Sequence, residues 1–280
     1  MDVMDVVSET ALITLKARVI ETEKPYPIIQ DVVGKQCLDI IQSHLPAEIQ
    51  NRILDRKLPP SLTNHIAIRA RKYDAETMAF VDNKPGGLVV SLGCGFDTRY
   101  WRISDKAWKN YIEIDLPEIV AIKQAILADR ITYPMIGCSV LDDNWIKAIQ
   151  QLQTENVFLI AEGLLMYLAP ADVIRLFDKL SQSFANSFIL FEIVHRRYTQ
   201  GIWKKNVEAK IKRTLGTDAG AAYQFGIVTA SEIETYGSDI EVVEEWSYFQ
   251  DEDIRPGFLR LFRHLKFFTR SQWTIKAKLN

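Results

Sequence analysis

The sequence has only three cysteines and no apolar run long enough to span a membrane. Cys37, Cys94 and Cys138 are an odd number without the spacing of zinc ligands, which argues against a disulfide framework and against a metal site. The longest apolar run, residues 157–169, contains a glutamate and falls short of the roughly 20 residues that a spanning helix needs. We therefore expect free buried thiols, no bound metal and no membrane partner.

Neither sign of charge is in excess. Within 280 residues, 34 Lys and Arg face 36 Asp and Glu, which gives a net charge of −2. Without a basic field, nucleic acid is not an expected partner. Residues 1–11 carry two aspartates where a secretory signal would carry positive charge, so we expect a cytoplasmic location.

The first 84 residues show only helical patterns. Ile66, Ala70 and Tyr73 follow the three-and-four spacing of an amphipathic helix, and proline-containing stretches at 25–27 and 58–60 divide the region into three expected helices. We expect this region, 1–84, to form an N-terminal helical cap.

Beyond residue 85 the pattern changes to strands that alternate with helices. Short apolar runs predict buried parallel strands at 88–92, 110–115, 133–139, 157–162 and 187–194. The tail predicts two more strands, 240–249 and 272–279, with a helix over 256–265 between them. This order predicts a doubly wound α/β domain over 85–280, packed with the helical cap as one structural unit.

A pair of glycines follows the first expected strand, in the sequence SLGCGFDTRYWRI (91–103). Gly93 and Gly95 let a cofactor approach the backbone, because glycine has no Cβ and tolerates positive φ. Thr98 stands where a dinucleotide-binding motif has its third glycine, which disfavours a pyrophosphate. Asp115 ends the second expected strand, where a carboxylate can accept hydrogen bonds from both ribose hydroxyls. The pattern favours an adenosine ligand without phosphates, although each residue alone also fits a plain turn or a helix N-cap.

Three stretches, VVSLGCGFDTRYWRI, YIEIDLPEIVAIK and FLIAEGLLMYLAP, resemble successive motifs of the leucine carboxyl methyltransferase family, which includes protein phosphatase methyltransferases and polyketide O-methyltransferases. The resemblance reaches RARKYD (69–74) and thins after about residue 198. It implies a class I, Rossmann-like methyltransferase sheet of seven strands with an antiparallel last strand. It also implies S-adenosylmethionine as the cofactor.

The resemblance further implies roles at the cofactor for particular residues. It assigns the methionine carboxylate to Arg69, with Arg71 as the competitor, because a guanidinium fits a carboxylate bidentately. For Arg71 the alternative is a surface pair with Asp74. The resemblance places Glu162 near the cofactor's amino group. A function there would also explain a carboxylate in an apolar stretch, because burying an unpaired charge is costly. The resemblance also implies that Gly93 and Gly95 line the methionine and ribose end of the cofactor, and that Asp115 binds the ribose.

The adenine contacts depart from the family pattern. Many members have an Asp-Leu pair after the third strand, whereas this chain reads CSVLDDNW (138–145). Two alternatives stay open: Ser139 together with the backbone of Val140 contacts the adenine, or Asp142 does.

The methyl acceptor determines whether a base is needed. A carboxylate is already ionised at neutral pH, whereas a hydroxyl must lose a proton. His195 follows the fifth expected strand and is the candidate base, with a helix cap or a solvent-facing position as the alternative. Tyr167 is a candidate for the acceptor pocket, with a core position as its alternative.

Residues 196–226 carry seven Lys and Arg against two acidic residues. This segment is a candidate cover over the acceptor site that would attract an anionic acceptor. A solvated basic helix face is the alternative.

We therefore predict an S-adenosylmethionine-dependent O-methyltransferase that acts on a carboxylate or phenolic hydroxyl of a small molecule. Alternatives are methyl esterification of a protein C-terminus, a nicotinamide-dependent oxidoreductase, or a catalytically silent cofactor-binding module. The oligomeric state is not predicted.

Overall fold

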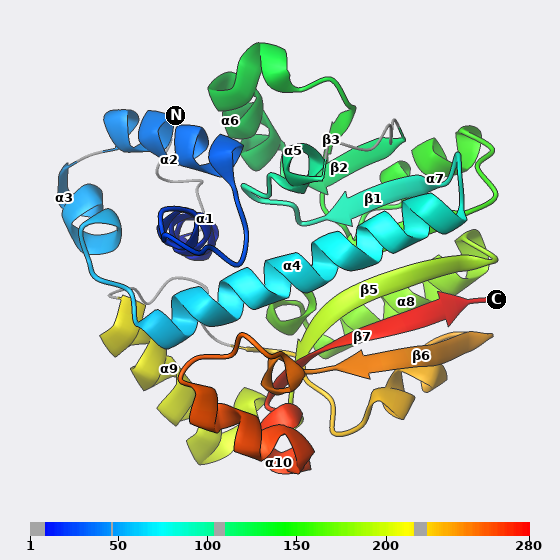
Figure 1. Ribbon diagram of the computed structural model, residues 1–280. Helices are drawn as coiled ribbons and strands as arrows, with labels where there is room; N and C mark the ends of the chain where they lie inside the picture. The colour runs from blue at the N-terminus through cyan, green and yellow to red at the C-terminus, as the bar shows by residue number, and fades with distance from the viewer. Residues whose placement is uncertain (1–8, 46, 104–109, 216–222) are drawn as a thin grey trace.

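The protein forms one seven-stranded sheet with helices on both faces, as seen in a computed structural model that describes residues 9–45, 47–103, 110–215 and 223–280 (Figure 1). The strand order is β3-β2-β1-β4-β5-β7-β6. The strands are β1 (Leu88–Leu92), β2 (Tyr111–Asp115), β3 (Met135–Gly137), β4 (Val157–Ala161), β5 (Ser187–Val194), β6 (Ile240–Trp246) and β7 (Gln272–Leu279). Strands β1 to β5 are parallel, and β7 runs antiparallel to both of its neighbours, β5 and β6. The predicted fold class is confirmed.

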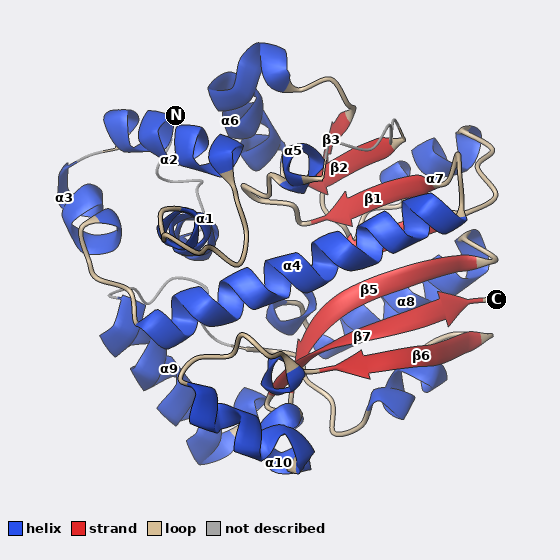
Figure 2. Cartoon of the chain, viewed as in Figure 1, coloured by secondary structure: helices blue, strands red, loops and turns tan. Residues whose placement is uncertain are grey.

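The helices follow the predicted alternation with the strands (Figure 2). The α-helices are α1 (Glu9–Thr22), α2 (Val32–His44), α3 (Ala47–Ile49), α4 (Pro60–Asn83), α5 (Arg99–Arg102), α6 (Pro117–Leu127), α7 (Asn144–Gln151), α8 (Pro170–Ser183), α9 (Gly201–Leu215) and α10 (Lys266–Thr269). A π-helix, η1 (Gln50–Leu54), extends α3, so the N-terminal region has one helical segment more than expected. Short 3₁₀ segments are η2 (Ala128–Arg130), η3 (Leu165–Tyr167), η4 (Arg196–Thr199), η5 (Ala230–Thr235), η6 (Tyr248–Gln250) and η7 (Gly257–His264).

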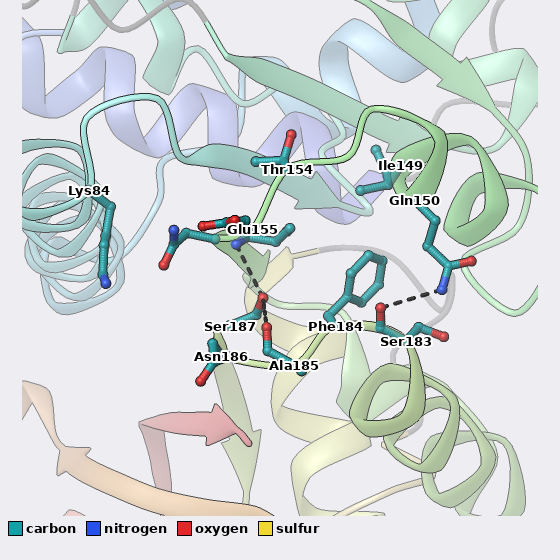
Figure 3. Close-up of a pocket in the computed structure, with 12 residues that line it drawn as sticks. Lys84, Ile149, Gln150, Thr154, Glu155, Ser183, Phe184, Ala185, Asn186 and Ser187 are labelled. Atoms are coloured by element: carbon teal, nitrogen blue, oxygen red, sulfur yellow. Dashed lines mark hydrogen bonds between the residues drawn. The ribbon is translucent and has the colours of Figure 1, made fainter.

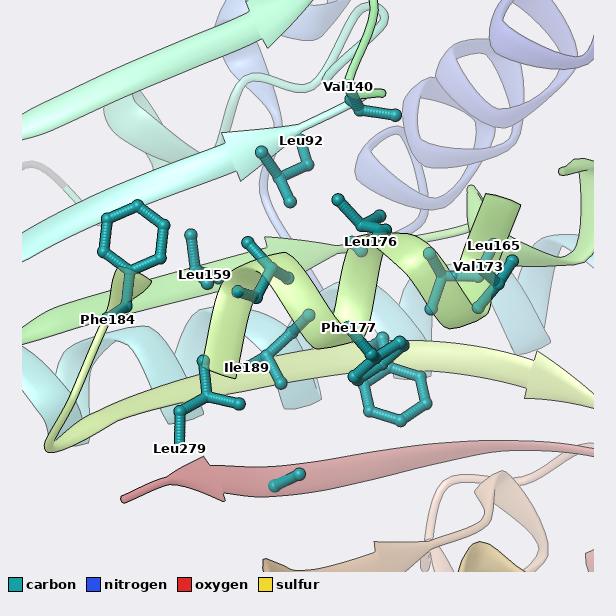
Figure 4. Packing of buried hydrophobic residues seen from close by; sticks show 14 of the residues in the cluster. Leu92, Val140, Leu159, Leu165, Val173, Leu176, Phe177, Phe184, Ile189 and Leu279 are labelled. Carbon is teal, nitrogen blue, oxygen red and sulfur yellow. The ribbon is translucent and has the colours of Figure 1, made fainter. Parts of the chain in front are cut away.

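Both faces of the central strands are buried, which explains why these strands are continuously apolar in sequence. Along β4, Leu159 points to the face that α7 and α8 cover, and Phe158 points to the face that α4 covers. Figure 4 shows Leu176 and Phe177 of α8 packed on the first of these faces. The sheet is therefore held rigidly between two helical layers.

The N-terminal helices share a core with the α/β part. Leu12 and Leu15 of α1 and Cys37 of α2 belong to one buried cluster that also contains Phe96 and Leu127. A domain boundary at residue 84 stays a prediction.

The tail differs from the expected pattern. Strand β6 ends at Trp246 rather than at residue 249, because Ser247 caps η6. The helix expected over 256–265 is present as the 3₁₀-helix η7, and the short α10 follows it. Leu259 and Phe262, three residues apart, pack inward together, which suits the three residues per turn of a 3₁₀-helix.

Within the described ranges, no helix has the length and apolar character needed to cross a membrane. The same part of the chain contains no group of three or more His, Cys, Asp or Glu side chains able to hold a metal ion. All three cysteines are free, and Cys138 is only half-buried.

Candidate active site

The predicted site residues follow the ends of the parallel strands, at one edge of the sheet. Gly93 follows β1, Asp115 ends β2, and Glu162 follows β4. Helix α4 crosses in front of the sheet and brings Arg69 to this edge (Figure 1). Carboxyl edges of open α/β sheets are where such folds bind ligands.

The turn after β1 requires glycine at two positions. Gly93 and Gly95 have φ values of +61° and +49°, a region that residues with a Cβ rarely adopt. A Cβ on Gly93 would lie 2.9 Å from a side-chain carbon of Leu164. A Cβ on Gly95 would lie 3.4 Å from the side chain of Ala11, so α1 lies directly over this turn.

Asp115 is tied to the glycine turn by the backbone. Its Oδ2 accepts a 2.6 Å hydrogen bond from the N–H of Gly95, and its Oδ1 accepts one of 2.7 Å from the N–H of Leu116. Burial raises the pKa of Asp115, and these N–H groups oppose that rise. The carboxylate is held in one orientation, with lone pairs left for a ligand.

Arg69 is held between two carboxylates. Its Nε donates to Glu162 Oε1 at 2.8 Å, and its Nη1 donates to Glu192 Oε2 at 2.7 Å. Burial works to raise the pKa of Glu162, but Arg69 and Arg99 outweigh it, so the pKa is lowered and Glu162 stays ionised. The structure thus brings the predicted Arg69 and Glu162 into direct contact.

An ionic network extends from this pair to the N-terminal helices. Arg99 Nη2 donates to Glu162 Oε2 at 2.5 Å, and Arg99 also binds Asp74 and Asp97. The network comprises Arg18, Asp31, Arg69, Asp74, Asp97, Arg99, Arg102, Glu162 and Glu192. The sequence D-T-R at 97–99 therefore fastens the glycine turn to α4.

The competitor Arg71 faces elsewhere. Its guanidinium binds Asp251 at 2.7 Å and Asp253 at 2.6 Å, both in the connection between β6 and β7. The alternative pair of Arg71 with Asp74 is wrong, because Asp74 binds Arg99 and Arg102 instead.

Two residues near Arg69 were missed by the sequence analysis. Glu192 of β5 is buried and also accepts a 2.8 Å hydrogen bond from Gln272. His65, one turn before Arg69 on α4, has Nε2 3.9 Å from Glu192 Oε1 and stacks on Tyr248 with ring centres 4.3 Å apart. Burial raises the pKa of Glu192 and lowers the pKa of His65 to about 3. A signal for Glu192 was present, because a glutamate inside the apolar strand 187–194 raises the same question as Glu162.

The loop after β3 is folded on itself. The N–H of Ser139 donates to Asp142 at 3.1 Å, and the Ser139 hydroxyl accepts from the N–H of Leu141 at 3.2 Å. The carbonyl of Val140 accepts from the indole of Trp145 at 3.0 Å. Both alternatives for the adenine contacts stay predictions.

His195 and Tyr167 lie at different places along this edge. His195 caps η4, since its Nδ1 accepts from the N–H of Arg197, and within the described chain no hydrogen bond or ion pair joins it to the ionic network. Burial, with Arg197 and Arg196, lowers the pKa of His195, so its imidazole is neutral at pH 7. Tyr167 of η3 is half-buried, with its ring 5.8 Å from that of Tyr223.

The basic segment 196–226 forms η4 and α9 and then returns to the site. The backbone N–H of Gln224 donates to Met166, beside Tyr167. Residues 216–222 lie outside the described residues, so the proposed cover stays a prediction. The segment does end next to the candidate acceptor residue.

A surface hollow of about 700 Å³ lies at the opposite edge of the sheet. It is lined by residues at the starts of β4 and β5, among them Val157. Figure 3 shows Ser187 at the start of β5 in this lining. Since parallel strands present ligand sites at their carboxyl ends, this hollow is not the candidate active site.

Known proteins share the sequence and the fold. A family model described as leucine carboxyl methyltransferase matches residues 11–181. The tetracenomycin polyketide synthesis O-methyltransferase TcmP of Streptomyces glaucescens is 26% identical over 253 residues, 89% of this chain and 87% of that protein. An S-adenosyl-L-methionine-dependent methyltransferase, dpfgK of Gibberella zeae, is 27% identical over 66% of this chain and 64% of its own length.

A crystal structure assigned to a methyltransferase from Thermobifida fusca YX superposes with a TM-score of 0.59 at 15% identity, covering 99% of this chain and 97% of that one. This likeness shows the class I methyltransferase fold. The family match covers more than half of the chain, and it agrees with the motifs around the glycine turn. The chain therefore belongs to the leucine carboxyl methyltransferase family and is an S-adenosylmethionine-dependent methyltransferase.

Proposed function

We propose that this methyltransferase transfers the methyl group of S-adenosylmethionine to a carboxylate or hydroxyl oxygen of a small-molecule acceptor. The observation that carries the proposal is the contact between Arg69 and Glu162 beside the glycine turn. It offers a cation and an anion side by side, which is what the zwitterionic methionine end of the cofactor requires. The name of the relative TcmP supports a small-molecule acceptor.

Arg69 would bind the cofactor's carboxylate. A guanidinium has five N–H donors, and the contacts with Glu162 and Glu192 use one on Nε and one on Nη1. Three donors on Nη1 and Nη2 remain, and they are available to a carboxylate. Gly163, with φ at +67°, has a Cβ position 3.8 Å from Nη2, so its lack of a side chain leaves these donors open.

The remaining cofactor contacts follow from the fixed orientation of the acidic side chains. Glu162 would accept from the ammonium group, and Asp115 would accept from the ribose hydroxyls. Gly93 and Gly95 would contact the methionine and ribose end through the backbone of their turn, which positive φ shapes. Ser139 and the backbone of Val140 would border the adenine.

The charge of the ionic network suits this cofactor. The network has four arginines and five carboxylates, so with every group ionised it carries one net negative charge. S-adenosylmethionine carries one net positive charge, because its sulfonium and ammonium outnumber its carboxylate. Charges in a buried site interact more strongly than charges in water, so the network favours the charged cofactor over its neutral product.

When bound, the cofactor supplies an electrophilic methyl group, and the protein supplies position and exclusion of water. Tyr167 would border the acceptor, because η3 directly follows the β4 loop that holds Glu162. His195 would accept the proton of a hydroxyl acceptor once its Nδ1 is released from the N–H of Arg197, because a neutral imidazole has a single acceptor nitrogen. A carboxylate acceptor would need no base.

Two measurements test the proposal. Calorimetric titration should detect binding of S-adenosylhomocysteine and none of NAD. A labelled-methyl assay against panels of carboxylic acids and phenols should then give a methyl ester or a methyl ether. Binding of NAD, or cofactor binding without turnover on either panel, would contradict the proposal.

A further inference from the structure

Large apolar side chains project into solvent from one region of the surface, which we call the apolar–basic ridge. Its apolar members are Ile202, Trp203, Phe258, Leu261, Leu265 and Phe267. Leu261 is 78% exposed and Phe258 is 60% exposed. Apolar patches of this kind on a folded protein mark sites of association.

The ridge is continuous although its residues come from distant parts of the chain. The rings of Trp203 on α9 and Phe267 on α10 contact each other, with centres 6.4 Å apart. The Arg197 guanidinium lies 3.9 Å from the centre of the Phe267 ring. Helix α10 follows η7 after one residue and meets α9 through Phe267 and Trp203, so the three segments are neighbours.

Segment η7 has two apolar faces, and the core needs only one of them. Phe262 and Leu259 pack inward against Ile68 and Phe249. Phe258 and Leu261, three residues apart, share the outward face of the 3₁₀-helix. The outward pair therefore has no role in the core.

The ridge is strongly basic. Residues 254–280 contain no Asp or Glu, whereas Arg255, Arg260, Arg263 and Lys266 lie within or beside η7. In the part of the chain that the structure describes, Arg255, Arg263 and Lys266 contact no carboxylate, and Arg260 has only Glu252 at 3.9 Å. Apart from the exposed Glu252 beside Arg260, these side chains favour an occupant that is both apolar and anionic.

An anionic lipid bilayer meets both conditions. A symmetric contact with a second copy would bring two basic surfaces together, which like-charge repulsion disfavours. Segments α9, η7 and α10 lie at the outer rim of the molecule (Figure 1), and the apolar side chains of the ridge are exposed. Phe, Leu and Trp flanked by Arg and Lys are the residues that enter the boundary between lipid head groups and acyl chains.

We propose that the apolar–basic ridge binds this protein peripherally to anionic lipid bilayers, with Phe258 and Leu261 inserted among the lipid head groups. From the sequence we expected no membrane partner, because no apolar run is long enough to span a bilayer. The connection between β6 and β7, which contains η7, lies at the same edge of the sheet as Glu162 and Arg69. Binding through the ridge would hold that edge toward the bilayer and give apolar acceptors a route to it.

Co-sedimentation of the full chain with vesicles tests the proposal. The protein should sediment with vesicles of phosphatidylcholine mixed with phosphatidylserine, less with phosphatidylcholine alone, and less as salt is raised. The double variant Phe258→Ser/Leu261→Ser should lower the partition coefficient about tenfold or more, because two apolar side chains no longer leave water. Arg263→Gln/Lys266→Gln should lower it about fivefold for each charge removed.

A matched control is Leu152→Ser/Ile174→Ser, which changes two exposed apolar residues at the end of α7 and on α8. It should bind vesicles as the unchanged protein does. Circular dichroism and S-adenosylhomocysteine binding verify that each variant folds. The proposal would be overturned if wild-type protein does not bind phosphatidylserine vesicles. It would also be overturned if the Phe258→Ser/Leu261→Ser variant binds these vesicles as well as wild type does. Light scattering that shows a wild-type dimer and a monomeric ridge variant would overturn it too, since the ridge would then join two copies.

Discussion

Arg69 connects three elements through single side-chain contacts. Located on α4, it binds Glu162 after β4 and Glu192 on β5. Burial opposes its charge, and the two carboxylates outweigh burial and raise the pKa of Arg69. A residue in this position is charged at every accessible pH and is fixed before any ligand arrives.

Replacing Arg69 with lysine should weaken cofactor binding. A lysine ammonium is a point charge that cannot reach both glutamates and a ligand carboxylate at once. We expect the dissociation constant of S-adenosylhomocysteine to rise about tenfold to a hundredfold, as hydrogen bonds between charged groups are lost. Isothermal titration calorimetry measures this dissociation constant. Arg71→Lys is the control, because Arg71 binds Asp251 and Asp253 instead, and equal affinities in the two variants would refute the role of Arg69.

Single residues show where sequence reasoning reaches its limit. Arg69 and Glu162 could be named because each stands in a recognisable motif. The partners of Arg71 could not be named from the sequence, because Asp251 and Asp253 lie some 180 positions away along the chain. Only folding brings them near Arg71. Glu192 could have been predicted as a site residue, because a glutamate inside an apolar strand is unusual.

At the scale of elements, the turn between β1 and α5 combines backbone and packing constraints. Gly93 adopts positive φ, and its missing Cβ leaves room for Leu164 of the β4 loop. The turn is also fastened by Asp115 and by the arginines of α5. Its shape therefore depends on β2, β4 and α4 together.

Gly93→Ala should impair both stability and cofactor binding. Positive φ costs an alanine about 1 kcal/mol, and the new Cβ would press on Leu164 at 2.9 Å. Gly86→Ala is a matched control, since Gly86 has φ of +89° with no atom within 4 Å of its Cβ position. Urea unfolding should show both variants less stable, whereas calorimetry should show weaker S-adenosylhomocysteine binding for Gly93→Ala alone. Identical cofactor affinities would mean that the turn does not contact the cofactor.

Elements differ in how far the sequence could define them. The strands β1, β4 and β5 were predictable because burial on both faces leaves runs that are apolar except at Ser91, Ser187 and Glu192. For segment η7 the sequence predicted a helix but not its type, since apolar residues spaced by three and four fit an α-helix and a 3₁₀-helix almost equally well. The choice between them depends on the core around Phe249, which is a tertiary contact.

At the scale of the whole molecule, Asp31 joins the helical cap to the sheet. It lies at the N-cap of α2, accepts from the N–H of Gly34, and binds Arg18 of α1 and Arg102 of α5. Burial works to raise the pKa of Asp31, but Arg102 and Arg18 outweigh it, so the folded pKa lies below the ordinary value. This arrangement predicts that residues 1–84 and 85–280 unfold in one transition.

The pH dependence of stability should report on this connection. Because the folded pKa of Asp31 is depressed, its contribution is fully present above the unfolded pKa of about 4 and is lost as pH falls through the folded value. Asp31→Asn should lower the free energy of unfolding at pH 7 by roughly 3 kcal/mol, since it leaves two buried arginines without that charge. The difference from wild type should shrink below about pH 4.

Asp143→Asn is the control for this comparison. Asp143 pairs with Lys179, and that lysine lowers its pKa too, but the pair is exposed and should add little to stability. Calorimetry at pH 7 and pH 3 makes the comparison in a single set of scans. If the free energy of unfolding of Asp31→Asn differs from that of wild type by the same amount at every pH, the charge of Asp31 does not stabilise the fold. If wild type instead melts in two transitions, the ionic network does not unite the cap with the sheet, and the cofactor edge is assembled from two independently stable parts.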